Sequence, residues 1–361
     1  MKIEKLILGA MVILMTMTSC FDDKDPYSAG IYFYRPCYLD NGVYANTTVD
    51  SVVMFSYGKW NVSLSDGSWT RLGLTEGKGN VIYRIPVSFD QNTTGKSRQC
   101  MVRFYDVEHP DVANIFYYIQ HATRGDGSLG NAPAVKKITG SDGSLFEFSY
   151  DNIFRPVNLT MSKNGTSLRS LALIYNDRDS SLVVYDGDEK YMCTYSPDYQ
   201  PYSLKSSTDT IGYYNMVLNN YYPPIKIIAF SYEHHKGGKV ASAATYYLNG
   251  RSLAADSMHV ADSVYQYANG EIIEKVMPKY SNVDNRCQTV DVNQLVDGID
   301  HCDPYLLMSL FRYARHTSVL SELTSGKRHQ TVEVQLNADK SISRMTVSTT
   351  GGDTIVYDFE Y

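Results

Sequence analysis

The chain has 361 residues, of which 20% are charged, and its formal net charge is −6. This length is enough for two domains that each bury a core of their own. No long basic stripe is interleaved with aromatic residues, which excludes nucleic acid as an expected partner. Tyrosine occurs 31 times and tryptophan twice, and a composition rich in Tyr, Val, Ile and Thr favours β-strands.

The first twenty residues have the pattern of a lipoprotein signal peptide. Lys2 and Lys5 precede the apolar run Leu6–Met17, which is shorter than the roughly 18 residues of a membrane-spanning helix. The small residues Thr18-Ser19 and then Cys20 follow. This resembles the bacterial lipobox, which implies removal of residues 1–19 and anchoring to a lipid bilayer through acylated Cys20. The alternative is a simple cleaved signal peptide with an incidental cysteine.

Residues 20–28 form an acidic tether, because Asp22, Asp23 and Asp25 stand close behind the cysteine. A solvated spacer has this composition. The cluster also resembles the acidic signal that follows the lipidated cysteine of Bacteroidetes lipoproteins and directs them to the outer leaflet of the outer membrane. We therefore expect an outer-membrane lipoprotein exposed at the cell surface, with the periplasmic face as the alternative.

Residues 29–122 have the pattern of a β-sandwich. Short runs of β-branched and aromatic residues alternate with turns that contain Gly, Asn and Asp, and no helical period occurs. The expected strands are Ile31–Tyr34, Ser51–Ser56, Trp60–Leu64, Val81–Phe89, Arg98–Val107 and Asn114–Gln120. Gly77 and Gly79 are predicted to be turn glycines, because no helix pattern follows them as a phosphate-binding loop requires.

Several motifs follow one another in this region: Trp60-Asn61-Val62-Ser63, Ser68-Trp69, Gly77-x-Gly79, Asn92-Thr93-Thr94-Gly95-x-x-Arg98 and Tyr118-Ile119-Gln120. Their order resembles the BACON domain, a Bacteroidetes-associated domain that is often N-terminal. The resemblance implies an Ig-like sandwich that either binds carbohydrate or acts as a spacer. Trp60 and Trp69 are the obvious candidates for stacking on sugar. We predict instead that they are core residues, because a Trp on a short sandwich strand is usually buried.

A Gly/Ser/Asn/Pro-rich linker is predicted at residues 123–133, and a second domain at residues 134–361. Apolar residues alternate in this domain, which indicates strands with one buried face. Turn dipeptides such as Asn164-Gly165 and Asp186-Gly187 recur between the runs, and Asn-Gly is a strong hairpin signal. The pattern predicts a larger antiparallel β-meander, either a curved sheet or a closed barrel.

One stretch of the second domain departs from the alternating pattern. The segment Asp291–Val296 leads towards Asp303-Pro304, and Tyr305–Ala314 then has helical spacing of apolar residues. Asp303 suits the N-cap and Pro304 the first helical position. We expect one or two short helices that cap the sheet, with the main helix near residues 304–315. The fold class is thus all-β, with short capping helices as the exception.

Four further motifs occur in the second domain: Val135-Lys136-Lys137-Ile138, Ser149-Tyr150-Asp151, Asp291–Val296 and Tyr357-x-Phe359-x-Tyr361. They resemble an uncharacterised family of Bacteroidetes lipoprotein domains described as having a porin-like fold. The family implies a shape and no activity. Phe154 occupies a turn position at which the family has glycine.

No sequence motif predicts a catalytic residue, a metal site or a cofactor. The chain has no GxSxG, HExxH, Walker loop or EF-hand loop. His234-His235 would face opposite sides of a strand, and His301-Cys302-Asp303 has no second His/Cys cluster to complete a site. Five cysteines follow Cys20 without a CxxC motif, and we predict buried free thiols. Pairing of Cys37 with Cys100 and of Cys287 with Cys302 stays open; the five are Cys37, Cys100, Cys193, Cys287 and Cys302.

The expected function is that of a non-catalytic surface lipoprotein that binds glycan, either mucin or polysaccharide. Aromatic faces stack on the C–H surfaces of sugars, and the candidate platforms are the turn tyrosines Tyr199, Tyr202, Tyr221 and Tyr222. One alternative is a structural scaffold that binds other envelope proteins. A second alternative is a hydrolase of unknown type. An exposed, coplanar aromatic row would favour the first function, and an extended apolar patch would favour the scaffold.

Overall fold

The computed structural model describes residues 30–33, 42–178, 181–194, 203–206, 209–219, 226–236, 239–248, 261–268, 271–298 and 316–361. This part of the chain is nearly all β, as predicted. It contains no helix with the length and hydropathy needed to cross a bilayer. The contacts divide the chain into two compact units. The described part of the first is 30–33, 48–90 and 99–118, whereas 42–47 and 91–98 belong with the second, which continues from residue 119.

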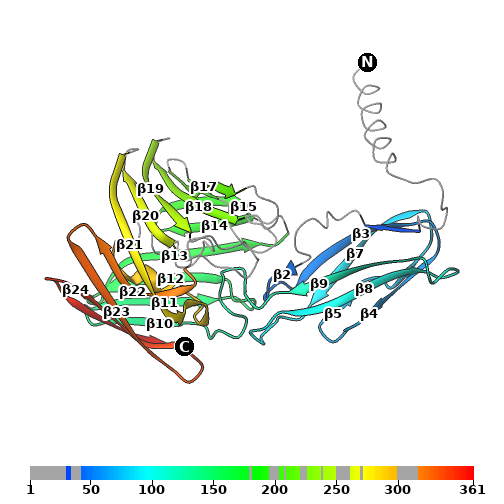
Figure 1. Cartoon of the computed structure of the whole chain (residues 1–361), viewed down its shortest axis with the longest axis horizontal. Helices are drawn as coiled ribbons and strands as arrows, with labels where there is room; N and C mark the ends of the chain where they lie inside the picture. The colour runs from blue at the N-terminus through cyan, green and yellow to red at the C-terminus, as the bar shows by residue number, and fades with distance from the viewer. Residues whose placement is uncertain are drawn as a thin grey trace, which may run out of the picture. The chain divides into compact units, whose positions relative to one another are not determined.

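The strands of the N-terminal sandwich form two sheets, as the sequence predicts (Figure 1). The four-stranded sheet has the order β1 (Ile31–Phe33), β3 (Val49–Ser56), β7 (Val81–Phe89), β5 (Thr70–Leu72). The five-stranded sheet has the order β2 (Gly42–Val43), β9 (Ala113–Gln120), β8 (Arg98–Asp106), β4 (Trp60–Leu64), β6 (Glu76–Gly77). Strand β2 runs parallel to β9.

Aromatic side chains from both sheets form the core between them. The Trp60 ring of β4 lies 5.2 Å from the Tyr83 ring of β7, centroid to centroid, and the Phe89 ring of β7 lies 4.9 Å from the Tyr118 ring of β9. Trp60 is fully buried and Trp69 is 3% exposed. The prediction that both tryptophans are core residues is therefore confirmed, and neither ring is available to a sugar.

The second unit is an antiparallel meander, as predicted, in which each strand pairs with the next along the chain. Its first strands are β10 (Lys137–Gly140), β11 (Ser144–Tyr150), β12 (Pro156–Lys163), β13 (Thr166–Asn176), β14 (Ser181–Asp186), β15 (Glu189–Thr194), β16 (Ser203–Lys205) and β17 (Asp209–Asn219). The others are β18 (Lys226–Lys236), β19 (Lys239–Leu248), β20 (Ala261–Ala268), β21 (Glu271–Asp284), β22 (Ser318–Ser325), β23 (Arg328–Leu336), β24 (Ile342–Thr349) and β25 (Thr354–Glu360).

The order of strand pairs in this unit closes on itself, because β25 pairs with β10. The narrowest link is between β15 and β16, where the single pair Met192↔Lys205 joins the strands. The predicted Asn164-Gly165 hairpin is present: Lys163 pairs with Thr166, and the two turn residues have φ of 50° and 77°. Positive φ at both central residues is the conformation that a two-residue type I′ turn requires.

The alternating apolar residues of the second unit point inwards, as their period of two predicts. Phe146, Phe148, Leu171 and Leu173 belong to one buried core, whereas Glu147, between the two phenylalanines, is exposed. The segment between β21 and β22 contributes to the same core through Val290, Val292, Leu295 and Val296. A loop segment therefore packs with the inward faces of the strands.

Two short 3₁₀ helices, η1 (Asn285–Cys287) and η2 (Val292–Leu295), shape this loop. Asp291 is fully buried and is the N-cap of η2. Its Oδ1 accepts hydrogen bonds from Asn285 Nδ2 at 2.7 Å and from the backbone N of Asn293 at 3.1 Å, and its Oδ2 accepts one from the backbone N of His316 at 3.2 Å. One carboxylate thus ties together η1, η2 and His316, two residues before β22. The helix predicted near residues 304–315 lies outside the described residues.

The predicted linker, residues 123–133, is folded in the second unit. Thr123 forms a β-bridge with Leu129, and Thr123 and Arg124 are buried. The Arg124 guanidinium donates to the backbone carbonyls of Gly130 at 2.8 Å and Ala132 at 3.0 Å. Because this side chain satisfies the carbonyls of the segment, a Gly-rich stretch without apolar pattern adopts a defined conformation.

Phe154 has φ of 63°, in the left-handed region, at the position where the resembling family has glycine. Its ring lies under the Arg124 guanidinium, 3.8 Å from the guanidinium carbon to the ring centroid. The left-handed conformation costs an ordinary L-residue about 1–2 kcal/mol, and a cation–π contact contributes about 0.5–2 kcal/mol. The stacking on Arg124 therefore offsets a backbone strain that glycine would not have.

We predict that Phe154→Ala is less stable than Phe154→Gly by about 1 kcal/mol, because alanine loses the ring and keeps the strained φ. Urea unfolding of both variants measures the difference. The matched control is Asn152, in the same loop but outside the positive-φ region, where Gly is expected to be no more stable than Ala. Equal stability of the two Phe154 variants would contradict the assigned strain.

His316 provides a second test of the buried loop. Burial lowers the pKa of His316 below its ordinary value and outweighs the opposing attraction of Asp291. The unfolded chain therefore takes up a proton near pH 6.5 that the folded chain resists. The free energy of unfolding should fall as the pH drops below about 6.5, by up to about 1.4 kcal/mol per pH unit. We expect His316→Gln to reduce the slope of the free energy of unfolding against pH between pH 6.5 and 5.5, measured by urea titration. An unchanged slope would refute the contribution assigned to His316.

Candidate functional site

Most of the site residues predicted from sequence are not among the described residues. Cys20 and the tyrosines Tyr199, Tyr202, Tyr221 and Tyr222 lie outside them, as does His301-Cys302-Asp303. Their roles therefore stay predictions. His234 and His235 are neighbours in β18. Within the described part of the chain, no group of three His, Cys, Asp or Glu residues is placed to hold a metal ion.

The prediction of buried free thiols can be checked at Cys100. This side chain is fully buried and free, and its Sγ lies 3.1 Å from the backbone carbonyl oxygen of Asp66. Cys287 is buried too. Cys37 and Cys302 lie outside the described residues, and of Cys193 only the backbone is described.

A cluster of aromatic residues lies on the outer face of the four-stranded sheet, the face turned away from the sandwich core. Tyr32 of β1 pairs with Phe55 of β3, and Phe55 pairs with Ile82 of β7, so the three side chains form a row across three strands. Tyr57 follows at the end of β3, and it is 54% exposed, whereas Ile82 is 62% exposed. We call Tyr32, Phe55, Tyr57 and Ile82 the aromatic face.

The rings of the aromatic face have two orientations. The Tyr32 and Phe55 rings lie 6.5 Å apart, centroid to centroid, with their planes 29° from each other. The Tyr57 ring stands nearly perpendicular to both, at 6.2 Å from Tyr32 and 4.8 Å from Phe55. The result is a corner formed by two roughly aligned rings and one upright ring. Such an arrangement exposes apolar ring surface that an isolated exposed tyrosine does not provide.

The turn at residues 77–80 holds the end of β3 in place beneath Tyr57. Asn80 donates its backbone N–H to the carbonyl of Ser56 at 2.7 Å. A Cβ atom on Gly79 would lie 2.0 Å from the carbonyl oxygen of Tyr57, so only glycine allows this approach. Gly79 therefore belongs to a turn, as predicted, and allows the backbone to approach closely at the edge of the aromatic face.

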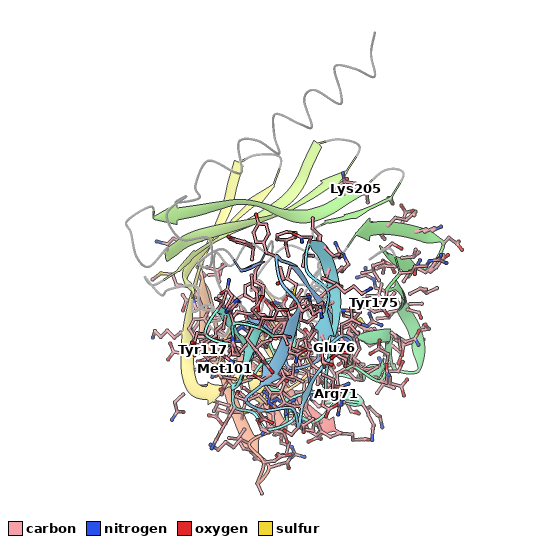
Figure 2. All side chains as sticks on the ribbon, turned by 90° about the vertical axis from the view of Figure 1, so that its right-hand side faces the viewer. Arg71, Glu76, Met101, Tyr117, Tyr175 and Lys205 are labelled. Carbon is pink, nitrogen blue, oxygen red and sulfur yellow. The ribbon has the colours of Figure 1, made fainter. Side chains whose placement is uncertain are left out.

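The same outer face continues along the strands. Val53 pairs with Arg84, one row from Phe55 and Ile82, and Ser51 pairs with Pro86 in the row after that. The two charged residues among the outward strand positions are Arg84 of β7 and Arg71 of β5, and both are exposed. Arg71 lies beside Ser88, on the same sheet. In Figure 2, Arg71 lies apart from Tyr117 and Met101, which belong to the five-stranded sheet.

The two arginines have different surroundings. Arg71 donates from both terminal nitrogens to Asp90, at 2.8 and 3.0 Å, and the hydrogen bond and attraction from Asp90 raise the pKa of Arg71. Arg84 donates from one nitrogen to Ser51 Oγ at 3.3 Å, and no ion pair within the described residues involves it. Its charge therefore faces solvent beside the aromatic face.

Two carboxylates meet in the second unit, and both are bound to one arginine. Arg155 Nε donates to Asp151 at 2.6 Å, and Arg155 also donates to Asp177 at 2.6 Å. Burial alone would lower the pKa of Arg155, but hydrogen bonds and attraction from Asp177 and Asp151 hold it above its ordinary value. The guanidinium is hydrogen-bonded to both acids and packs 4.3 Å from the Tyr175 ring centroid. This cluster is a structural ion-pair network and does not resemble the acid–base pair of a glycoside hydrolase.

The aromatic face was not predicted from the sequence, although the strands that carry it were. In β3 the apolar residues Val52 and Met54 are buried, and Val53 and Phe55 have the opposite parity and point outwards. Strand β3 has apolar residues at both its odd and its even positions, but a sandwich sheet buries only one face. This pattern could have indicated an exposed apolar surface.

No protein-family model and no curated protein matches this chain. A porin-like protein from Bacteroides uniformis aligns with 63% of this chain and 98% of its own, at 12% identity and a TM-score of 0.44. The GH5 xyloglucanase of Bacteroides ovatus aligns with 29% of this chain and only 21% of its own, at 20% identity and a TM-score of 0.22. A PapD-like domain of human CEP192 aligns with 28% of this chain and 90% of its own, at 13% identity and a TM-score of 0.20. At these similarities none of the three indicates a function for this chain.

Proposed function

We propose that this protein is a non-catalytic, lipid-anchored protein of the cell envelope that binds glycan at the cell surface through the aromatic face of its first unit. The observation that carries the proposal is the aromatic face, in which the exposed residues Tyr57 and Ile82 adjoin the half-buried rings of Tyr32 and Phe55. The turn tyrosines at 199, 202, 221 and 222 remain further candidate contacts in the second unit.

The chemistry of the aromatic face suits a sugar. One side of a pyranose ring carries C–H groups that pack on an aromatic face, while its hydroxyls stay hydrated or bond to polar neighbours. Tyr57 and Tyr32 each add a hydroxyl at the edge of an apolar ring, and Ser51 and Arg84 offer polar groups along the strands. Contiguous exposed apolar surface of this kind commonly marks a binding site.

The sequence supports the same proposal independently. The lipobox-like end at Cys20 and its acidic tether favour export and anchoring to the outer membrane. The motifs from Trp60 to Gln120 resemble a domain for which carbohydrate binding has been suggested. The sandwich tryptophans are buried, so the binding surface proposed for this chain is formed by other residues than those motifs.

A structural or protein-interaction scaffold is the second candidate, and one observation favours it. Ile174 of β13 pairs with Val183 of β14, which pairs with Met192 of β15. Ile174 is 56% and Met192 54% exposed, so the three form an apolar row on the outside of the second unit. The row suits contact with another protein better than contact with a sugar, because it lacks aromatic rings.

We predict that the double variant Tyr57→Ala, Ile82→Ser binds about tenfold more weakly to any polysaccharide that retards the wild-type chain. This loss is equivalent to about 1.4 kcal/mol. Native affinity electrophoresis of the full mature chain against mucin glycans and plant polysaccharides measures the change. Both positions are exposed, so stability should change by less than about 0.5 kcal/mol for each.

Tyr117→Ala is the matched control, because Tyr117 is a 42% exposed tyrosine on the other sheet of the same sandwich (Figure 2). Its retardation should equal that of the wild type. If no polysaccharide retards the wild-type chain, the glycan proposal fails for that panel and the scaffold becomes the better candidate. If the control variant and the test variant lose the same amount of polysaccharide binding, the binding site is not the aromatic face.

A further inference from the structure

The outer face of the four-stranded sheet carries an uneven charge. Its outward strand positions include two arginines and no acidic residue. Arg71 is bound at both terminal nitrogens by Asp90, which lies just beyond β7. Arg84 has a single hydrogen bond, to the uncharged Ser51 hydroxyl. The face therefore presents one guanidinium whose charge is already compensated and one whose charge is not.

Arg84 is placed to act together with the aromatic face. It stands two residues after Ile82 on β7, and its partner Val53 stands two residues before Phe55 on β3. Two residues along a strand correspond to about 7 Å. A sugar that packs on Phe55 and Ile82 would thus hold its own substituents, or those of the next sugar, within reach of the long Arg84 side chain.

We propose that the glycan bound at the aromatic face is anionic and that Arg84 binds its carboxylate or sulfate group. This inference rests on the proposed function and narrows its substrate class. Guanidinium is a planar fork that donates two parallel hydrogen bonds to a carboxylate or sulfate, and such charge-assisted bonds are stronger than those to a neutral hydroxyl. The long-range charge of the protein opposes the same ligand, because the net charge is −6, so the attraction must come from a local group.

The test uses matched pairs of polymers that differ only in charge. Polygalacturonate is compared with fully methyl-esterified galacturonan, and chondroitin sulfate with its desulfated form. We expect the full mature chain to bind at least one acidic polymer about tenfold more tightly than its less charged counterpart. The preference should shrink between 50 and 500 mM salt, since exposed charges are screened over about 10 Å at 0.1 M. The first pair reports a carboxylate and the second a sulfate.

Arg84→Gln should remove the preference for the more acidic polymer of a pair and leave binding of its less charged counterpart in place. Arg71→Gln is the matched control: it removes the same charge from the same face, but from a guanidinium already bound by Asp90, and the preference should survive. Both residues are exposed, and a urea midpoint equal to that of the wild type confirms that each variant is folded.

Three results would overturn the inference. Equal binding of both members of each pair by the wild type removes the anion assignment while glycan binding stands. If the Arg84→Gln variant still prefers the more acidic polymer, another residue binds the anionic group. If none of the four polymers binds, the glycan function fails for this panel and the assignment fails with it, a pattern that cannot be confused with equal binding.

Discussion

The larger unit depends on one buried carboxylate. Asp291 is completely buried, and the three hydrogen bonds that it accepts come from uncharged donors on η1, on η2 and before β22. Leaving a buried carboxylate without these donors would cost several kcal/mol, so the loop has one favourable arrangement. That arrangement delivers four apolar side chains to the common core: Val290, Val292, Leu295 and Val296.

The buried inward faces of β11, β13 and β14 restrict where these strands can bind another molecule. Inward positions of β11, β13 and β14 belong to the same buried cluster as the loop, and charged residues such as Glu147 point outwards. Recognition by these strands must therefore use outer surfaces. The first unit also presents its outer surface for recognition. Its tryptophans are buried in the core, and the aromatic face lies on the outer side of the sheet that contains β1, β3 and β7.

Much of the fold could be predicted from local sequence. Asn164-Gly165 determined a hairpin because both residues tolerate positive φ, and the period of two fixed which residues of β11 face the core. The candidate site could not be predicted as readily. Strand β3 has apolar residues on both of its faces. Only its pairing with β7 and its packing against the other sheet decide which face is exposed. The conformation of residues 123–133 could not be predicted from composition either, since the side chain of Arg124, within this segment, binds two of its backbone carbonyls.

The close approach of Gly79 to the Tyr57 carbonyl has an evolutionary consequence. Any larger residue at position 79 would displace the end of β3, so little change is expected in the backbone beneath the aromatic face. The side chains of Ile82 and Arg84 above it are exposed, and substitutions at such exposed positions usually change stability by less than about 0.5 kcal/mol. Divergent copies of this chain are therefore expected to vary at positions 82 and 84, while the loop that supports the end of β3 keeps its length and its glycine.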